Sequence, residues 1–378
     1  MAILVLLSCK DDKKPVPTPI ASSVLAAASS APVIATATVT PSPAIAADGG
    51  LCKIDLGPFA MDFVGAAAIV PKTDGAQIIG NDKGTPHIVT IAGGKAPAAP
   101  SIVRTSSIAC ASAHGQTFCP DSDGKIRLAD KIIAESRPGS RIAAAEVGGH
   151  AIVGYNKDRK TTEGTTQTAE IWSDDGTTQH LSDDGNGATA LDLAARDGEA
   201  LALTIDAHMG MTPIHARTLK WIGKLVLGPD TVLMVGGNAE AHTWGTLATK
   251  HDTGPSFALV PIAKDISAFG VVSLRIDGTP KMDAAQDWSL YDNGLDPAPI
   301  AATHDSPRMF VVRLRPTGKE PRAPRVLELG SLDASGRFGS LGIVHGSIAS
   351  VAIAGDASGV WLAYTDDGQT TVEHRVCP

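Results

Sequence analysis

The sequence has few aromatic residues: they make up only 4% of its 378 residues, although hydrophobic residues make up 43%. A sizeable core is possible, but it must be built mainly from Val, Ile, Leu and Ala, which suits short and regular strands. Beyond the first few residues the chain also lacks an apolar run of roughly 18 residues, the length that a membrane-spanning helix needs. We therefore expect the body of the chain to be an all-β fold.

Basic residues gather only at Lys10, Lys13 and Lys14, and the formal net charge is −8. Because binding to phosphates requires clustered Lys and Arg, we expect no nucleic acid partner. The chain contains no GxGxxG or GxxxxGK[ST] pattern for a nucleotide, and no GxSxG or HExxH pattern for hydrolysis. We predict no cofactor and assign no catalytic residue. Whether the protein is an enzyme stays open, and the sequence favours a role that is not enzymatic.

Composition divides the chain into residues 1–9, 10–50 and 51–378. After a charged start, the middle part consists almost entirely of Pro, Ala, Ser, Thr and Val. Its repeated prolines break helices, and it has no polar and apolar periodicity with which to bury one face. We therefore predict a disordered tether. An Ala-rich helix at residues 21–30 is the alternative, although short isolated helices nucleate poorly.

Five cysteines are present, and an odd number in an exported protein leaves one unpaired. We expect this to be Cys9, because it precedes the tether and lies far from any core. Cys110 and Cys119 lie at equal distances on either side of His114-Gly115. A two-residue turn there would place them opposite each other across a hairpin, close enough for a disulfide. We predict this disulfide instead of a metal or redox site, because no second pair and no CxxC spacing accompany it.

Residues 51–378 repeat one pattern: two apolar strands joined by a turn, then an Asp-rich turn and a third strand. Asp-Gly between apolar runs is a strong hairpin signal, because Gly supplies the positive φ that tight turns need. The turns of the leading strand pairs fall near Gly75, Gly115, Gly149, Gly198, Pro307 and Gly359. Most gaps between them are roughly 40 to 50 residues, and one gap about twice as long leaves room for a divergent unit around residues 235–270.

About seven such units are typical of a β-propeller, so we predict one of about seven blades, within a range of six to eight. Residues 51–59 form a strand with no hairpin partner, and residues 371–377 form the last strand. In propellers an N-terminal strand commonly joins the last blade, and a disulfide between Cys52 and Cys377 would lock that seam. The alternative is a set of β-sandwich domains, because few aromatic residues are available for blades that stack on large side chains.

The Asp-Gly turns do not match a known ligand motif. In Ser173-Asp174-Asp175-Gly176 the Gly comes one position earlier than in the Asp box of propellers resembling sialidases, and no aromatic residue follows. Asp121-Ser122-Asp123-Gly124 begins like a calcium loop, but Ile132 occupies the position of the bidentate Glu. We interpret these aspartates as turn-forming residues.

One polar cluster, DAHMGMTPIH, contains Asp206, His208 and His215 together with two methionines. Imidazole and thioether ligands would suit copper. Two histidines on a loop with Gly and Pro do not define a coordination geometry, however. We predict no metal site and keep these three residues only as candidates.

The first part of the chain ends in Leu6-Leu7-Ser8-Cys9, which resembles the lipobox of bacterial lipoproteins. The resemblance implies that a peptidase cuts before Cys9 and that its sulfur carries diacylglycerol. Lys10, next to it, implies sorting to the outer membrane. Eight residues cannot supply a complete signal peptide, so we expect the true start to lie upstream. Four further cysteines in two pairs fit an oxidising compartment.

Together these features predict a lipoprotein of the bacterial cell envelope, anchored to the lipid bilayer through Cys9. We expect its propeller to be a binding or interaction module, with a protein or glycan ligand on one propeller face. One alternative is a propeller-type glycan hydrolase or lyase whose catalytic residues come from several blades. The other is an assembly or structural subunit of the envelope.

Overall fold

All regular elements of the described chain are β-strands. A computed structural model describes residues 51–66, 68–95, 103–104, 109–162, 164–181, 188–206, 212–235, 245–252, 254–263, 269–276, 286–290, 300–316, 325–345, 348–366 and 368–378. In these ranges there is no helix that is long and apolar enough to cross a membrane. Cys9 and the rest of residues 1–50 lie outside the described residues, and so do the tether and lipobox predictions.

Most of the strands form seven antiparallel sheets that follow one another along the chain. Blade 1 is β3 (Ala68–Lys72), β4 (Gly75–Asp82) and β5 (Thr85–Ala92); blade 2 is β7 (Ala111–Ala113), β8 (Gln116–Pro120), β9 (Lys125–Leu128) and β10 (Lys131–Glu135). Blade 3 is β11 (Ile142–Val147), β12 (His150–Thr161), β13 (Gly164–Ser173) and β14 (Thr178–His180). Blade 4 is β15 (Ala188–Arg196), β16 (Glu199–Asp206), β17 (Thr212–Trp221) and β18 (Leu225–Leu227), with β19 (Thr231–Val235) also paired to β17.

The remaining three blades have the same order of strands. Blade 5 is β20 (Thr246–Ala248), β21 (Phe257–Ala263), β22 (Phe269–Arg275) and β23 (Gln286–Leu290); blade 6 is β24 (Ile300–Ala302), β25 (Phe310–Pro316), β26 (Arg325–Leu332) and β27 (Phe338–His345). Blade 7 is β28 (Ile348–Gly355), β29 (Gly359–Asp366), β30 (Gln369–Val376) and β1 (Lys53–Ala60). A separate short pair joins β2 (Phe63–Val64) to β6 (Val103–Arg104).

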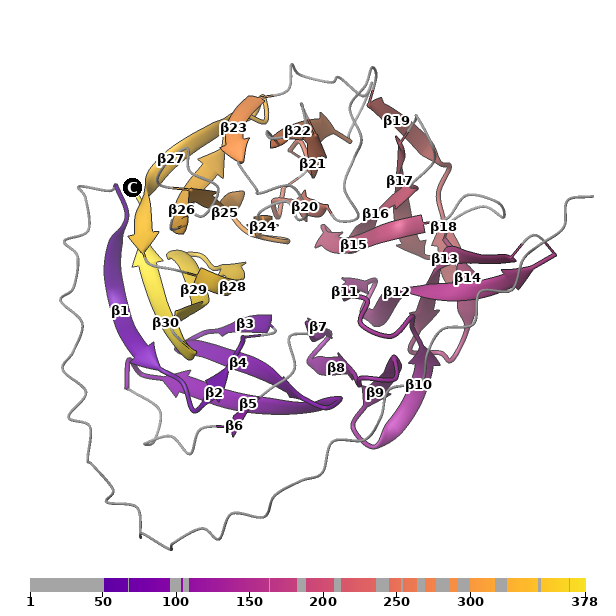
Figure 1. Ribbon diagram of the computed structural model, residues 1–378, viewed down its shortest axis with the longest axis horizontal. Helices are drawn as coiled ribbons and strands as arrows, with labels where there is room; N and C mark the ends of the chain where they lie inside the picture. The colour runs from indigo at the N-terminus through magenta and orange to yellow at the C-terminus, as the bar shows by residue number, and fades with distance from the viewer. Residues whose placement is uncertain are drawn as a thin grey trace, which may run out of the picture. The chain divides into compact units, whose positions relative to one another are not determined.

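The seven sheets form a ring in which the first strand of each blade lies innermost (Figure 1). Neighbouring inner strands contact each other around the whole ring, from β3 through β7, β11, β15, β20 and β24 to β28, which contacts β3 again. The fold is therefore a seven-bladed β-propeller, as the repeat pattern predicts. The divergent unit expected around residues 235–270 is blade 5.

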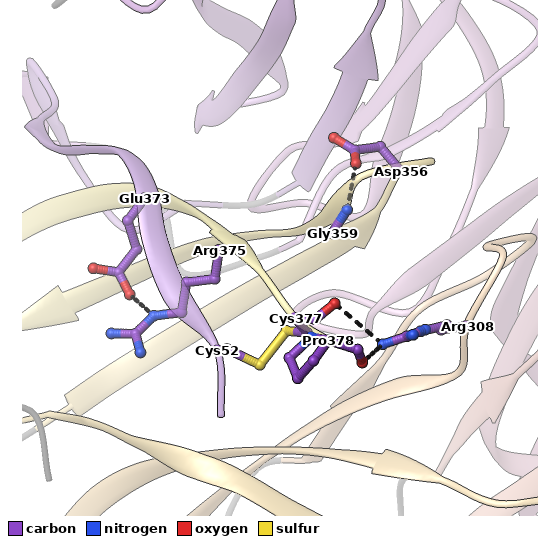
Figure 2. Close-up of a disulfide and its surroundings, with 8 residues drawn as sticks. All are labelled: Cys52, Arg308, Asp356, Gly359, Glu373, Arg375, Cys377 and Pro378. Atoms are coloured by element: carbon purple, nitrogen blue, oxygen red, sulfur yellow. Dashed lines mark hydrogen bonds and ion pairs between the residues drawn. A yellow bond between two sulfur atoms is a disulfide. The ribbon is translucent and has the colours of Figure 1, made fainter. Parts of the chain in front are cut away.

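The ring closes through β1, which pairs antiparallel with β30 and completes blade 7. Cys52, next to β1, and Cys377, after β30, form a disulfide with their Cα atoms 4.2 Å apart. Figure 2 shows this seam, in which the Arg308 guanidinium donates to the carbonyl oxygens of Cys377 and Pro378. The predicted closure and disulfide are both confirmed.

The second predicted disulfide, between Cys110 and Cys119, is also present. His114 and Gly115 form the turn between β7 and β8, with φ angles of 48° and 70°. Positive φ at both central residues twists the hairpin in the same sense as its strands. This geometry brings the two cysteines together across the hairpin.

The scarce aromatic residues are concentrated in the core. The largest fully buried side chains include Phe63, Phe118, Phe257, Phe310 and Trp361, and all but Phe63 lie on the second strand of a blade, in β8, β21, β25 and β29. Val, Ile, Leu and Ala fill the rest of each interface between blades, for example between blades 5 and 6. A few large side chains are therefore enough for this propeller, and the β-sandwich alternative is wrong.

Blades 2, 3, 5, 6 and 7 have four strands and blade 4 has a fifth, β19, whereas the repeat pattern predicts three. In blade 3 the outermost strand β14 is Thr178-Gln179-His180 with two exposed residues, and the sequence marks it only by the Asp-Gly turn before it. An outer strand faces solvent on one edge, so it needs no apolar run and leaves no hydrophobic signal.

The seam predicts a difference in stability between the two disulfides. Replacing Cys52 and Cys377 by Ser releases a loop of 325 residues, and the loop-entropy relation gives a loss of about 6 kcal/mol in the free energy of unfolding. The control replaces Cys110 and Cys119, which are nine residues apart, and should lose about 2 to 3 kcal/mol. Urea unfolding followed by tryptophan fluorescence measures both. Equal losses would contradict the role of the seam.

Candidate functional site

The inner strands surround a cavity of about 580 Å³ at the centre of the ring. Alanine is its commonest lining residue, and none of the described lining residues is Phe, Tyr or Trp. The inner strands of blades 2, 3 and 6 are the alanine-rich segments Ala111–Ala113, Ile142–Val147 and Ile300–Ala302. Methyl groups leave open the space that larger side chains would fill, so this part of the ring is available to a ligand.

Asp192 is the most highly coordinated polar residue in the cavity wall. It lies on β15 and is only 8% exposed. Its Oδ2 atom accepts hydrogen bonds from the backbone N–H of Leu247 at 2.6 Å and the hydroxyl of Thr246 at 3.1 Å, while its Oδ1 atom accepts from the N–H of Leu193 at 2.9 Å. His304 Nε2 lies 3.1 Å from the same Oδ2. A buried carboxylate needs such partners, and these come from blades 4, 5 and 6.

His304 follows the inner strand of blade 6 and lines the cavity. Burial opposes a charge on its imidazole, but the neighbouring carboxylate of Asp192, with a smaller contribution from Asp305, outweighs that effect and raises the pKa of His304. Arg141, just before β11, also lines the cavity. Burial lowers the pKa of the Arg141 guanidinium, and attraction to Asp192 partly offsets this. The centre of the ring therefore combines a cation, a carboxylate and a titratable imidazole.

Two further imidazole–carboxylate pairs lie at the cavity. His114, in the turn of blade 2, lies 3.1 Å from Glu146 on β11 of blade 3. His251 lies 2.7 Å from Asp305, so blade 5 is joined to the segment that follows β24. Each pair connects neighbouring blades, and His114, Glu146 and Asp305 line the cavity. The lining is thus polar where side chains enter it and apolar along its alanine walls.

The metal candidates from the sequence lie elsewhere. Asp206 ends β16 and His215 lies on β17, and their Oδ2 and Nε2 atoms are 3.2 Å apart. The other ring nitrogen of His215 lies 2.6 Å from Asp230 Oδ2, and Arg217 lies 3.5 Å from that same oxygen. His208 lies outside the described residues. Within the described part of the chain no group of three or more His, Cys, Asp or Glu residues could hold a metal ion.

Sequence reasoning did not find Asp192, His304 or Arg141. Asp192 stands in LDLAARDGEALAL as a lone carboxylate inside an apolar leading strand, and Arg141 directly precedes the apolar run IAAA. A charged residue in or beside an inner strand was the one available signal, because such strands face the centre of a propeller. These positions come from blades far apart in the sequence, so no local spacing connects them.

The cluster around His215 predicts a stability that depends on pH. The pKa of His215 is raised to about 9, and the largest cause is the hydrogen bond with Asp206. Burial lowers this pKa, and the interaction with Asp230 raises it further. Since an unfolded His titrates near pH 6.5, this stabilisation is complete below about pH 6.5 and is lost as pH rises through about 9. His215→Gln should lose about 2 to 3 kcal/mol of unfolding free energy at pH 6 and clearly less at pH 10.

Urea unfolding of the wild type and the variant at both pH values measures the difference. His180→Gln is the control, because the His180 side chain is 60% exposed. Its effect should be small at both pH values. A loss for His215→Gln that is the same at pH 6 and pH 10 would show that the imidazole stabilises the fold without its charge.

Comparison with known proteins supports the fold. No protein-family model and no curated protein matches the chain. Its structure is similar to the BP39L lectin from Burkholderia pseudomallei, with a TM-score of 0.53 and 14% identity over 82% of this chain and 94% of that one. An Aleuria aurantia lectin with a six-bladed β-propeller fold aligns with a TM-score of 0.43 and 12% identity, over 86% of this chain and 98% of the lectin. At 14% identity the likeness to BP39L shows a shared overall fold and nothing further.

Proposed function

We propose that this protein is a saccharide-binding β-propeller whose ligand occupies the central cavity. The observation that carries the proposal is the cavity itself, whose volume of about 580 Å³ falls within the usual range for small-molecule sites. The similarity in fold to BP39L, which is a lectin, supports the choice of a saccharide over other small polar ligands.

The cavity wall offers the chemistry that a saccharide requires. Sugar hydroxyls both donate and accept hydrogen bonds, and the lining includes the hydroxyl groups of Ser112, Thr117 and Thr246 and the amides of Gln77 and Gln116. The alanine walls supply shallow apolar surface against which C–H groups of a sugar ring can pack. Hydrogen bonds, not stacking on aromatic rings, would provide recognition.

We propose in addition that the propeller is held at the bacterial outer membrane by a lipid on Cys9. The lipobox-like Leu6-Leu7-Ser8-Cys9 supports this, as does Lys10 after it. The Cys52–Cys377 and Cys110–Cys119 disulfides fit an oxidising compartment such as the cell envelope. A tethered propeller would display its cavity to saccharides at the envelope.

Blocking the cavity should abolish binding. Ala354, on the inner strand β28, lines the cavity and is half-buried, so Ala354→Trp would fill space needed by a ligand. A glycan array identifies a bound saccharide, and calorimetry should then show at least a tenfold loss of affinity for this variant. The control is Ala357→Trp, in the exposed turn before β29, which should bind like the wild type. Failure to bind any saccharide, or unchanged binding by Ala354→Trp, would contradict the proposed site.

The anchor is tested separately in the native host, from the complete gene. Cys9→Ser should move the protein from the membrane fraction to the soluble fraction and abolish labelling with palmitate. Ser8→Ala is the control, since it keeps a small residue before the cysteine. Membrane association of Cys9→Ser equal to that of the wild type would rule out lipidation at this residue.

A further inference from the structure

The carboxylates that line the central cavity all have partners. Glu146 is paired with His114 at 3.1 Å, and Asp305 is paired with His251 at 2.7 Å. Asp192 is paired with His304 and accepts the hydrogen bonds from blades 4 and 5 described above. The negative charge of the lining is thus balanced locally and does not repel an anion as three free carboxylates would.

Arg141 differs from these groups. No ion pair within 4 Å and no hydrogen bond connects its guanidinium to another described residue, although it faces the cavity and feels the charge of Asp192. Arg141 is exposed where it lines the cavity, and the protein around its guanidinium lowers the pKa of that group. An exposed cation with no ion-pair partner is a ready site for an anion, and the planar guanidinium fits two oxygens of an oxyanion.

We propose that Arg141 binds the anionic oxygens of an acidic saccharide, a carboxylate or a sulfate ester, inside the central cavity. This inference rests on the proposed function and narrows its substrate class. The planar guanidinium of Arg141 provides the paired donors, Lys72 is a second cation in the cavity lining, and the carboxylate of Asp192 lies nearby.

Four probes in two pairs test the inference with the complete propeller: a galacturonic acid trimer with its neutral methyl ester, and galactose 6-sulfate with galactose. Calorimetry should show that the acid or the sulfate binds at least tenfold more tightly than its neutral counterpart. The pair that shows the larger preference for its charged member indicates whether the site binds a carboxylate or a sulfate ester. Raising the salt concentration should weaken the charged member more than the neutral one.

Arg141→Gln should abolish the preference for the charged member, and Arg141→Lys should retain part of it. The control is Arg137→Gln, four residues earlier, because Arg137 is 47% exposed in its pairing with Asp158 and does not line the cavity. That control should bind like the wild type. An undiminished preference in Arg141→Gln would overturn the inference.

Two outcomes separate this inference from the proposed function. In the first outcome, neutral saccharides bind and Ala354→Trp blocks their binding, but charged saccharides bind no more tightly than neutral ones. Only the role of Arg141 is then wrong. If no saccharide binds at all, both fail. A further measurement excludes simple misfolding: without ligand, Arg141→Gln should unfold at a urea midpoint no lower than that of the wild type, because it removes a charge that has no partner.

Discussion

The pairing of β1 with β30 is the constraint on which the ring depends. Every blade packs against two neighbours, so the first and last blades are fully covered only when the two ends of the propeller meet. The Cys52–Cys377 disulfide holds this contact covalently. Arg308, from the loop before β25, binds the last two carbonyl oxygens and connects blade 6 to the seam (Figure 2). Opening the seam would expose the apolar faces of blades 1 and 7 together.

Closure also determines what the inner strands can do. Seven strands around one axis leave a central space, and small residues such as those of Ala111–Ala113 leave it open. Polar side chains enter it only where other blades supply partners, and Asp192 is the clearest case because its oxygens join three blades. Asp192 therefore belongs both to the cavity wall and to the contacts that hold the blades together. Arg141 has no hydrogen bond or ion pair in this network and is available to a ligand.

Much of the architecture could be predicted because it depends on short-range rules. The turn at His114-Gly115 requires positive φ at two adjacent positions, and that local demand also fixed the partners Cys110 and Cys119. The spacing of leading strand pairs indicated seven blades, including blade 5, whose own signal is weak. The polar outer strand β14 left no apolar pattern and was marked only by the Asp-Gly turn before it, because a strand edge that faces solvent requires no apolar residues.

The sequence by itself determined the class of fold, the Cys110–Cys119 disulfide and the order of the hairpins, because turn chemistry and apolar alternation act between residues that are close along the chain. The Cys52–Cys377 disulfide joins residues 325 apart and could be predicted only from the expected closure of the ring. Only the tertiary structure decided which charges meet. Arg141, Asp192 and His304 belong to blades 3, 4 and 6, and they share one cavity because the ring closes. Conversely, Asp206 and His215, which look like a candidate metal cluster in the sequence, pair with each other and with Asp230 inside blade 4, and neither lines the cavity.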